Sequence, residues 1–356
     1  MTLGSRLCEG LSRAILLSQN HAFPAKSLAS RGDSSLFRWL DFKITNRCNN
    51  NCTYCGVKHD PPGTPEVLSV SDIQAAIQGA IDLEFTHFAL LGGEPSIRED
   101  VEQVFAPFNT DALPCDVMIV TNGLVFREPM YRSLFETRVN RARVIFSMDS
   151  VRAPNFKNQN PKECMQRILR IQAIAREYSK EDMDRDVSVH SVISRENLYD
   201  FGAFVKMFHR RGIDVSLALV CPSRFVERGN PRSFNVFTFD ELDVILGQLN
   251  DLEREGKLNF ANRTLLDYLR LYPFGELSMN TTCRAGRQHV IIGSDGGVYP
   301  CIRESYEDGG RFGNIREEGF RKIYRRMEGF GCESDFSSSC WDHFLWNRLG
   351  ELIEEG

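Results

Sequence analysis

Residues 48–55 read CNNNCTYC and place three cysteines, Cys48, Cys52 and Cys55, in one short segment. This segment closely follows LFRWLDFKIT (36–45), an apolar run typical of a strand. A structural zinc site needs four ligands and disulfides need pairs, so three neighbouring thiols match neither arrangement. Three thiolates can hold a [4Fe–4S] cluster while its fourth iron has no protein ligand. The segment therefore predicts a cluster loop with an open iron at the end of a strand.

The alternative is a zinc loop that borrows a fourth ligand, for which His59 is the candidate. Zinc sites normally use two pairs of ligands with a wide gap between them rather than a tight triplet. The spacing of the three cysteines therefore favours the iron–sulfur cluster.

The composition is that of an ordinary globular protein: of 356 residues, 42% are hydrophobic and 26% are charged. The net charge of −5 gives no basic footprint for nucleic acid, and no apolar run approaches the ~20 residues of a transmembrane helix. Eleven cysteines without a secretory signal indicate metal-binding or catalytic thiols in a reducing compartment. We therefore expect a soluble, cytoplasmic protein with no nucleic-acid or membrane partner.

Residues 1–36 are expected to form an N-terminal extension. Within it, RLCEGLSRAILLSQ (6–19) places Leu7 and Leu11 on one helical face. A mitochondrial transit peptide is one interpretation of this segment, but Glu9 and the modest arginine count favour a frayed or docked helix.

From residue 37 onwards, strand-like runs alternate with amphipathic helical stretches. The expected strands lie at 36–45, 86–93, 116–123, 143–150, 186–194 and 213–221, and the expected helices at 69–83, 98–108, 130–138, 161–178 and 197–212. The short connections favour parallel pairing through crossover helices. Six repeats are fewer than the eight of a closed barrel. We therefore predict an α/β fold with a partial (βα)6 TIM-like barrel over residues 37–225, or else a doubly wound sheet.

Polar and glycine-containing motifs stand at the carboxyl ends of these strands, where both types of fold collect their ligands. After the cluster loop they are GGEP (92–95), TNG (121–123), SMDS (147–150), SREN (194–197) and CPSR (221–224). Their common position predicts a single site that includes the three cysteines.

The loop ITNRCNNNCTYC (44–55) resembles the cluster loop of the radical S-adenosylmethionine (SAM) enzymes, and GGEP resembles their SAM-binding segment. The resemblance covers about residues 37–225. It implies that SAM chelates the open iron through its methionyl amine and carboxylate. Reductive cleavage would then yield methionine and a 5'-deoxyadenosyl radical that abstracts a substrate hydrogen. The electron donor would be a flavodoxin- or ferredoxin-type protein.

The same resemblance implies cofactor-binding roles for particular residues. Gly92, Gly93 and Glu94 would meet the amine of SAM. A strand-end glycine pair permits close backbone approach, and a carboxylate can meet an ammonium group. Polar residues at later strand ends are candidates for the sugar or carboxylate of SAM, with turn and helix-cap chemistry as the alternative. These candidates are Thr121, Asn122, Ser147, Asp149 and Ser191.

A second group of cysteines lies towards the end of the chain. The stretch HVIIGSDGGVYPC (289–301) contains two short strand runs around an Asp-Gly-Gly turn, which predicts a hairpin that brings Cys283 and Cys301 together. Cys332 and Cys340 follow, and four thiols can fully ligate a second [4Fe–4S] cluster. A four-cysteine zinc site is the alternative.

This stretch resembles the auxiliary-cluster domains called SPASM and, in shortened form, Twitch, which follow many radical SAM barrels. The full SPASM form carries seven cysteines and two clusters, so the four candidates fit the one-cluster Twitch form better. We therefore expect a small auxiliary-cluster domain at 275–356 and a helical connector at 226–274.

Cys221 stands at the end of the sixth predicted strand and is the candidate catalytic residue, as a hydrogen-atom donor to a substrate radical like that of radical epimerases. Burial as a small apolar side chain is the alternative, and it is the expectation for Cys115 and Cys164. His190 alternates with valines on a predicted strand and is a candidate for the barrel interior, although most such histidines are core groups.

Together, the motifs predict a radical SAM oxidoreductase that acts on an unactivated C–H bond. By resemblance, the auxiliary cluster can accept an electron from the substrate radical, so that the net reaction is a two-electron oxidation. The one-cluster layout resembles that of radical SAM dehydrogenases of aminocyclitols. A sugar-, aminocyclitol- or nucleoside-like metabolite of a biosynthetic pathway is therefore the first expected substrate class.

Modification of a ribosomally made peptide, by thioether formation, carbon crosslinking or epimerisation, is the main alternative. The expected N-terminal extension of 36 residues is shorter than a typical peptide-recognition domain, which favours a small molecule. Nucleotide cyclisation, as in molybdenum-cofactor synthesis, ranks third because that family's second cluster uses three cysteines with a close pair. A non-catalytic electron-transfer protein would not explain an open iron beside GGEP.

Overall fold

The computed structural model of the chain describes residues 38–52, 55, 60–110, 112–151, 159–219, 237–271, 285–301 and 310–330. The expectations for the N-terminal extension and for His59, Cys221, Cys283, Cys332 and Cys340 lie outside these residues. Within the described ranges, no helix combines the length and the apolar character needed to cross a membrane.

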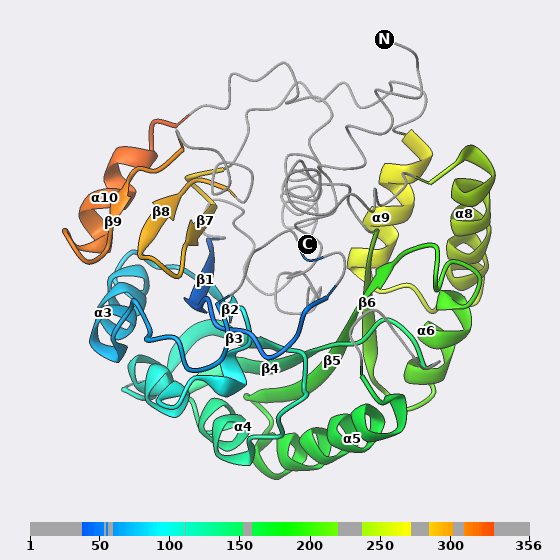
Figure 1. The fold of residues 1–356 in the computed structure, drawn as a ribbon, viewed down its shortest axis with the longest axis horizontal. Coiled ribbons are helices and arrows are strands. Elements are labelled where there is room, and N and C mark those ends of the chain that lie inside the picture. Colours follow the sequence, from blue (N-terminus) through cyan, green and yellow to red (C-terminus); the bar gives the residue numbers. More distant parts are fainter. Residues whose placement is uncertain are drawn as a thin grey trace.

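The strands of the described residues form one sheet in the order β6-β5-β4-β3-β2-β1-β7-β8-β9. The first six pair in parallel, each with the next in the chain, and helices cover the outer side of the curved sheet (Figure 1). This is an α/β fold of the partial TIM-barrel type, as predicted. The strands are β1 (Trp39–Thr45), β2 (His87–Gly92), β3 (Leu113–Thr121), β4 (Val139–Ser147), β5 (Asp184–Ile193), β6 (Asp214–Leu219), β7 (His289–Ile292), β8 (Gly297–Tyr299) and β9 (Gly313–Asn314).

The helices follow the predicted order, with one difference in type. They are α3 (Val70–Ile81), η3 (Pro95–Ile97), η4 (Val101–Asn109), α4 (Glu128–Phe135), α5 (Pro161–Tyr178), α6 (Phe201–His209), α8 (Phe239–Arg254), α9 (Phe260–Leu271) and α10 (Phe320–Met327). A capping box between Ser69 and Asp72 fixes the start of α3. The helix expected at 98–108 is instead the 3-10 helix η4, which contains Pro107. Proline has no N–H to donate and clashes with the preceding turn of an α-helix.

Two contacts identify the outer face of the sheet. On β2, the ring of Phe88 packs edge-on against Phe108 of η4, with ring centroids 5.0 Å apart. On β5, the guanidinium of Arg185 donates to the carbonyl of Phe135 at the end of α4 (Nε–O 2.8 Å). Because successive residues of a strand point to opposite faces, the next residue after Arg185, Asp186, points to the inner face.

The inner face carries charged and hydrogen-bonding side chains on neighbouring strands. The parallel register aligns His87 with Asp116, Arg143 with Asp186, and His190 with Ser216. The same face includes Asp41, His87, Asp116, Arg143, Asp186, Ser188, His190 and Ser216. All of these except Asp186 are buried.

The C-terminal hairpin extends the barrel sheet. The predicted hairpin is present as the antiparallel pair β7 and β8, and β7 pairs in parallel with β1. Across this seam, the imidazole of His289 contacts Asp41 (Nε2–Oδ2 3.0 Å), and the indole of Trp39 donates to the same carboxylate (Nε1–Oδ1 2.7 Å). These buried contacts attach the C-terminal segment to the barrel, while the expected domain boundaries stay predictions.

Candidate active site

The cluster loop is held by a short ladder of backbone hydrogen bonds. The N–H of Asp60 donates to the carbonyl of Asn46 (N–O 3.0 Å), and the N–H of Cys48 donates to the carbonyl of Asp60 (N–O 3.0 Å). Within the loop, the N–H of Cys55 donates to the carbonyl of Cys52 (N–O 3.1 Å). The chain that carries the three cysteines therefore leaves the end of β1 and returns beside it.

A buried arginine supports this loop. Arg98 has no exposed surface, and its guanidinium donates to the carbonyls of Ile44 (2.7 Å) and Leu68 (2.9 Å). Next to it, Glu66 accepts a hydrogen bond from Arg47 of the cluster loop (Nε–Oε1 2.7 Å). Sequence analysis missed this support. Most arginines are exposed to solvent, and nothing in the local sequence indicates that Arg98 is buried.

Gly92 and Gly93 lie where the end of β2 meets the start of the cluster loop. A Cβ at Gly92 would stand 2.2 Å from the carbonyl oxygen of Thr45, and one at Gly93 would stand 2.0 Å from that of Arg47. Gly92 also has φ +143°, a conformation that other residues rarely adopt. The close approach expected of this glycine pair is present, and its partner is the backbone that leads into the cysteines. Contact with SAM stays a prediction.

Glu94 is a buried carboxylate that joins the ends of β2 and β3. Its Oε1 accepts hydrogen bonds from the N–H of Ser96 (3.0 Å) and the hydroxyl of Thr121 (2.7 Å), and its Oε2 accepts one from the N–H of Asn122 (2.6 Å). Burial raises the pKa of Glu94, and the hydrogen bonds oppose that rise. A carboxylate can accept about four hydrogen bonds, so these three leave capacity for an ammonium group.

Asn122 links the end of β3 to the cluster loop. Its Nδ2 donates to Oδ1 of Asn49, between the first two cysteines, over 2.9 Å. Its carbonyl accepts a hydrogen bond from Nε2 of Gln159 (2.7 Å), which also donates to the carbonyl of Ser147 (2.9 Å). Thr121 and Asn122 therefore belong to the framework around the loop, and their predicted contact with SAM is untested. Asn49 was missed, although its place between the cysteines is a visible signal.

Asp149 and Ser191 brace the ends of β4 and β5. Oδ1 of Asp149 accepts a hydrogen bond from the N–H of Val192 (2.9 Å), and the hydroxyl of Ser191 donates to the carbonyl of Asp149 (3.3 Å). Ser191 is fully buried and points away from the inner face, since it follows the inward-pointing His190. Ser147 differs from both, because it is half-buried and aligns with His190 on the inner face.

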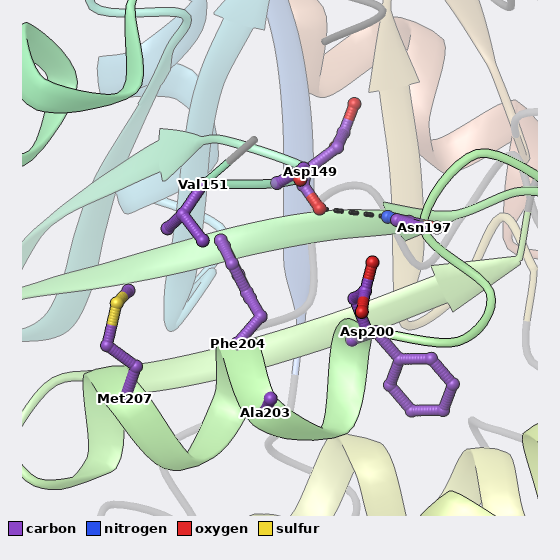
Figure 2. A pocket seen from close by; sticks show the side chains of 9 residues that line it. Asp149, Val151, Asn197, Asp200, Ala203, Phe204 and Met207 are labelled. Carbon is purple, nitrogen blue, oxygen red and sulfur yellow. Dashed lines mark hydrogen bonds between the residues drawn. The ribbon is translucent and has the colours of Figure 1, made fainter. Parts of the chain in front are cut away.

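A cavity of about 120 Å³ lies between α6 and the segment that follows β4 (Figure 2). Asp149 and Val151 line it from the segment after β4, and Phe204 and Met207 line it from α6. Asp200, the residue before α6, also lines it. The side-chain amide of Asn197 donates to the carbonyl of Asp149 (2.8 Å). Sequence analysis did not predict this cavity, because it depends on the spacing between α6 and the strand ends.

The three cysteines of the loop are partly buried. Burial raises the pKa of Cys48 to about 11, and the charges of Glu94 and Cys55 contribute to the rise. The thiolate is the form that binds metal, and a bound cation would favour that form of Cys48. In its described residues the structure does not gather three or more His, Cys, Asp or Glu side chains into a metal site. The fit to a [4Fe–4S] cluster, with one iron left for SAM, therefore rests on the number and spacing of the three thiols and not on their geometry. When bound, the cluster supplies the electron that cleaves SAM.

Cys301 marks the second cysteine group in the described residues. It is buried after β8, and the N–H of Gly286 donates to the carbonyl of Pro300 (N–O 2.9 Å). Gly286 therefore lies beside the segment that ends at Cys301, whereas the predicted meeting of Cys283 with Cys301 lies outside the described residues. Cys115 and Cys164 are buried among apolar side chains, as expected.

These features define the class of protein. A parallel α/β barrel carries a three-cysteine loop at the carboxyl end of its first strand, and a Gly-Gly-Glu segment after the second strand packs against that loop. The class is that of iron–sulfur barrel enzymes in which a small cofactor completes the coordination of the cluster.

Comparison with known families gives the same result. Residues 42–208 match the model of the radical SAM superfamily, and residues 283–341 match the SPASM iron–sulfur cluster-binding domain. The chain therefore contains a radical SAM domain followed by a C-terminal SPASM domain. The second match includes the four C-terminal cysteines. The cofactors are accordingly SAM, the [4Fe–4S] cluster that binds it and an auxiliary cluster.

Curated relatives match part of the chain. The GTP 3',8-cyclase of Desulforamulus reducens is 32% identical over 124 residues, which are 34% of this chain and 37% of that protein. The probable GTP 3',8-cyclase of Methanothermobacter thermautotrophicus is 31% identical over 129 residues, which are 36% of this chain and 41% of that protein. The chain therefore spans well under half the length of these relatives.

Solved structures match more of the chain at lower identity. Streptococcus suis SuiB bound to its precursor peptide SuiA has a TM-score of 0.63 at 16% identity, over 90% of this chain and 74% of that one. Hexahistidine-tagged anSMEcpe with bound AdoMet has a TM-score of 0.56 at 17% identity, over 89% of this chain and 96% of that one. At these identities the likeness shows the fold alone.

Proposed function

We propose that this chain cleaves SAM reductively and uses the 5'-deoxyadenosyl radical to transform a C–H bond of a small polar metabolite. The substrate is of the sugar, aminocyclitol or nucleoside type. The observation that carries the proposal is the chemistry of the inner face of β4, β5 and β6, in the same sheet whose strands β1 and β2 end at the cluster loop and the Gly-Gly-Glu segment.

Hydrogen-bonding groups occur at successive levels of this inner face. Arg143 of β4 pairs with Asp186 of β5 (Nη2–Oδ2 2.9 Å), and nearer the strand ends His190 contacts Ser216 (Nδ1–Oγ 2.9 Å). Burying polar and charged groups is unfavourable unless they find partners. A small number of placed polar groups in a binding site fix the orientation of a ligand through its own hydroxyl or amine groups, which supports a small polar metabolite as the substrate.

We further propose that the net reaction is an oxidation. Hydrogen-atom abstraction gives 5'-deoxyadenosine, and the substrate radical then loses one electron to the auxiliary cluster and one proton to a base or water. The pairing of β7 with β1 supports this, because it brings the Cys301 segment next to the barrel. A flavodoxin- or ferredoxin-type protein would donate the electron for SAM cleavage. Cys221 would instead donate a hydrogen atom if the substrate were epimerised.

The relatives bear on the substrate only in part. Their name gives GTP, a nucleoside-type metabolite within the proposed class, and the matched segment is 34% of this chain. The similarity to SuiB is limited to the fold. The peptide alternative therefore rests on that similarity of fold alone. GTP and a peptide therefore both belong in the test.

The experiment uses the full chain, purified and reconstituted with iron and sulfide under anaerobic conditions. Reduced protein receives SAM with GTP, 2-deoxystreptamine, myo-inositol or a serine- and cysteine-containing peptide, and 5'-deoxyadenosine is quantified. The proposal expects one of the three small molecules to stimulate 5'-deoxyadenosine formation and to yield a product that has lost two hydrogen atoms. Stimulation by the peptide alone would overturn it.

A further inference from the structure

We propose that the outer face of α10 is the docking surface for an acidic one-electron carrier protein. This inference rests on the proposed function, which requires an electron donor, and it says where on the chain that donor binds. Helix α10 has the sequence FRKIYRRM, with four basic residues and no acidic one. The whole chain has a net charge of −5, so this helix concentrates positive charge on a protein that is negative overall.

The two faces of α10 differ sharply. One face is apolar and buried, and its residues are Phe320, Ile323, Tyr324 and Met327. The other face is exposed and is called the basic face, and its residues are Arg321, Lys322, Arg325 and Arg326. The two sets follow the three- and four-residue spacing of an amphipathic helix. Because the helix lies at the edge of the molecule, the basic face is turned to solvent (Figure 1).

Aromatic contacts fix α10 on the barrel. The ring of Phe85, between α3 and β2, packs edge-on against Tyr324 and Phe320, with ring centroids 5.3 Å and 5.8 Å apart. The hydroxyl of Tyr324 donates to the carbonyl of Arg287, just before β7 (2.6 Å). These contacts hold the buried face in place and so give the basic face a fixed orientation. A surface that is already ordered loses less entropy when a partner binds.

The same helix adjoins the second cysteine group. A Cβ at Gly286 would stand 3.3 Å from the carbonyl oxygen of Met327 and 3.2 Å from Cβ of Pro300, the residue before Cys301. An α-helix with its side chains is about 10–12 Å across. A protein seated on the basic face would therefore lie about one helix diameter from a segment that is predicted to hold the auxiliary cluster. This proximity favours an electron carrier over other acidic proteins.

Part of the positive charge of the basic face is available to a partner. Glu318 pairs with Arg326 and Lys322 and so offsets one charge. The guanidinium of Arg321 is 3.9 Å from a carboxylate at the end of α3, and exposed pairs of this kind contribute little. Arg325 is exposed and has no ion pair among the residues that the structure describes. The basic face therefore keeps a net positive charge.

The carboxylates of an acidic carrier suit this face. A guanidinium binds a carboxylate through two parallel N–H groups, and three of the four basic residues are arginines. Opposite charges speed the encounter of two proteins, and salt screens this attraction. Electron-transfer complexes have small interfaces, and a helix of eight residues is about 12 Å long. The basic face can therefore form the centre of such an interface.

The test measures the binding of a flavodoxin of net negative charge to the full chain with reconstituted clusters. Anaerobic biolayer interferometry is recorded at about 50 and 300 mM NaCl, which span strong and weak screening. We expect the wild type to bind more weakly at the higher salt concentration. Lys322→Glu/Arg325→Glu reverses two exposed charges and should weaken binding about tenfold at low salt. Lys322→Gln/Arg325→Gln only removes these charges and should give an intermediate affinity.

Arg176→Glu/Arg254→Glu is the matched control. It changes the net charge of the chain by the same amount, at exposed positions of α5 and α8. The control should keep an affinity within about twofold of the wild type, because exposed charges far from an interface are largely screened by salt. Thermal unfolding of all variants verifies that each one is folded.

Several outcomes would overturn the docking surface. They are equal affinities for the charge-reversal and control variants, an affinity of the wild type that does not depend on salt, and no binding of the flavodoxin by the wild type. A duplex RNA and vesicles that contain phosphatidylserine are tested as alternative occupants. Tighter binding of either one than of the flavodoxin, lost in the charge-reversal variant, would also overturn the proposal.

A separate measurement tests the proposed function. Dithionite replaces the carrier as reductant, and the 5'-deoxyadenosine formed by the wild type is quantified with each candidate substrate. Its absence from every sample would overturn the proposed function, whatever the binding data show. Its presence together with no binding of the flavodoxin would overturn only the docking surface.

Discussion

Asn122, at the end of β3, donates a hydrogen bond from Nδ2 to Oδ1 of Asn49 in the cluster loop, over 2.9 Å. The Oδ1 of Asn122 accepts a hydrogen bond from the N–H of Leu124 (2.9 Å), which fixes the orientation of the amide. The N–H of Asn122 is in turn bound by Glu94. One network therefore joins the cluster loop to the Gly-Gly-Glu segment and the end of β3, and the shape of the loop depends on residues outside it.

Replacing Asn122 with Ala should loosen the cluster loop. A hydrogen bond between neutral groups contributes roughly 1 kcal/mol, so we expect about a fivefold slower SAM cleavage and less iron retained after anaerobic desalting. Asn51→Ala, an exposed position in the same loop, is the control and should retain wild-type values. Iron content and cleavage rate equal to those of the control would show that the Asn122–Asn49 contact is dispensable.

Replacing Gly93 with Ala should be destabilising. Its Cβ would meet the carbonyl oxygen of Arg47 at 2.0 Å, and backbone atoms cannot rotate away. We expect the free energy of unfolding to fall by about 1–3 kcal/mol, as in other overpacked sites. Gly247→Ala in α8 has open space and should stabilise by roughly 0.5–1 kcal/mol. Urea unfolding followed by circular dichroism measures both, and equal effects of the two substitutions would contradict this packing.

Replacing Arg98 with Met should remove the support beneath the cluster loop. The carbonyls of Ile44 and Leu68 would lose their donor, and the carboxylate of Glu66 would lose a nearby positive charge. We expect a loss of roughly 3 kcal/mol in the free energy of unfolding. Arg254→Met is the control, because Arg254 is 77% exposed and should contribute less than about 0.5 kcal/mol. A small effect at Arg98 would mean that the loop is held by other contacts.

The fall in the free energy of unfolding at acid pH should depend on Asp186. The partial burial of Asp186 would by itself raise its pKa, but the guanidinium groups of Arg143 and Arg141 lower that pKa below the ordinary value of 3.8. A lowered pKa in the folded state gives stability that is present above pH 3.8 and lost as the pH falls through the folded pKa. The free energy of unfolding of Asp186→Asn should therefore change less with pH between about 5 and 2 than that of the wild type. Parallel curves for the two proteins would exclude this contribution.

The elements that could be predicted from sequence are those with local signals. The alternation around His190 indicates the half-polar strand β5, and the Asp-Gly-Gly turn indicates the hairpin of β7 and β8. The spacing of the three cysteines is likewise a property of one short segment. The 3-10 geometry of η4 had a local signal too, Pro107, which the helical pattern around it concealed.

The remaining features depend on contacts between distant parts of the chain. The pairing of β7 with β1 brings His289 to Asp41, and no local pattern encodes which strand edge a hairpin will join. The role of Arg98 likewise depends on carbonyl groups of β1 and of the segment before α3. A polar inner face could be anticipated strand by strand, but its rows appear only when the register is known.

The central claim is that Cys48, Cys52 and Cys55 hold the cluster that cleaves SAM. The most direct measurement is the 5'-deoxyadenosine formed by anaerobic, reduced protein given SAM, with the wild type compared with a variant in which all three cysteines are Ala. We predict 5'-deoxyadenosine and about eight irons per chain for the wild type, and no 5'-deoxyadenosine with about four irons for the variant. Formation of 5'-deoxyadenosine by the variant, or its absence from the wild type, would contradict the claim.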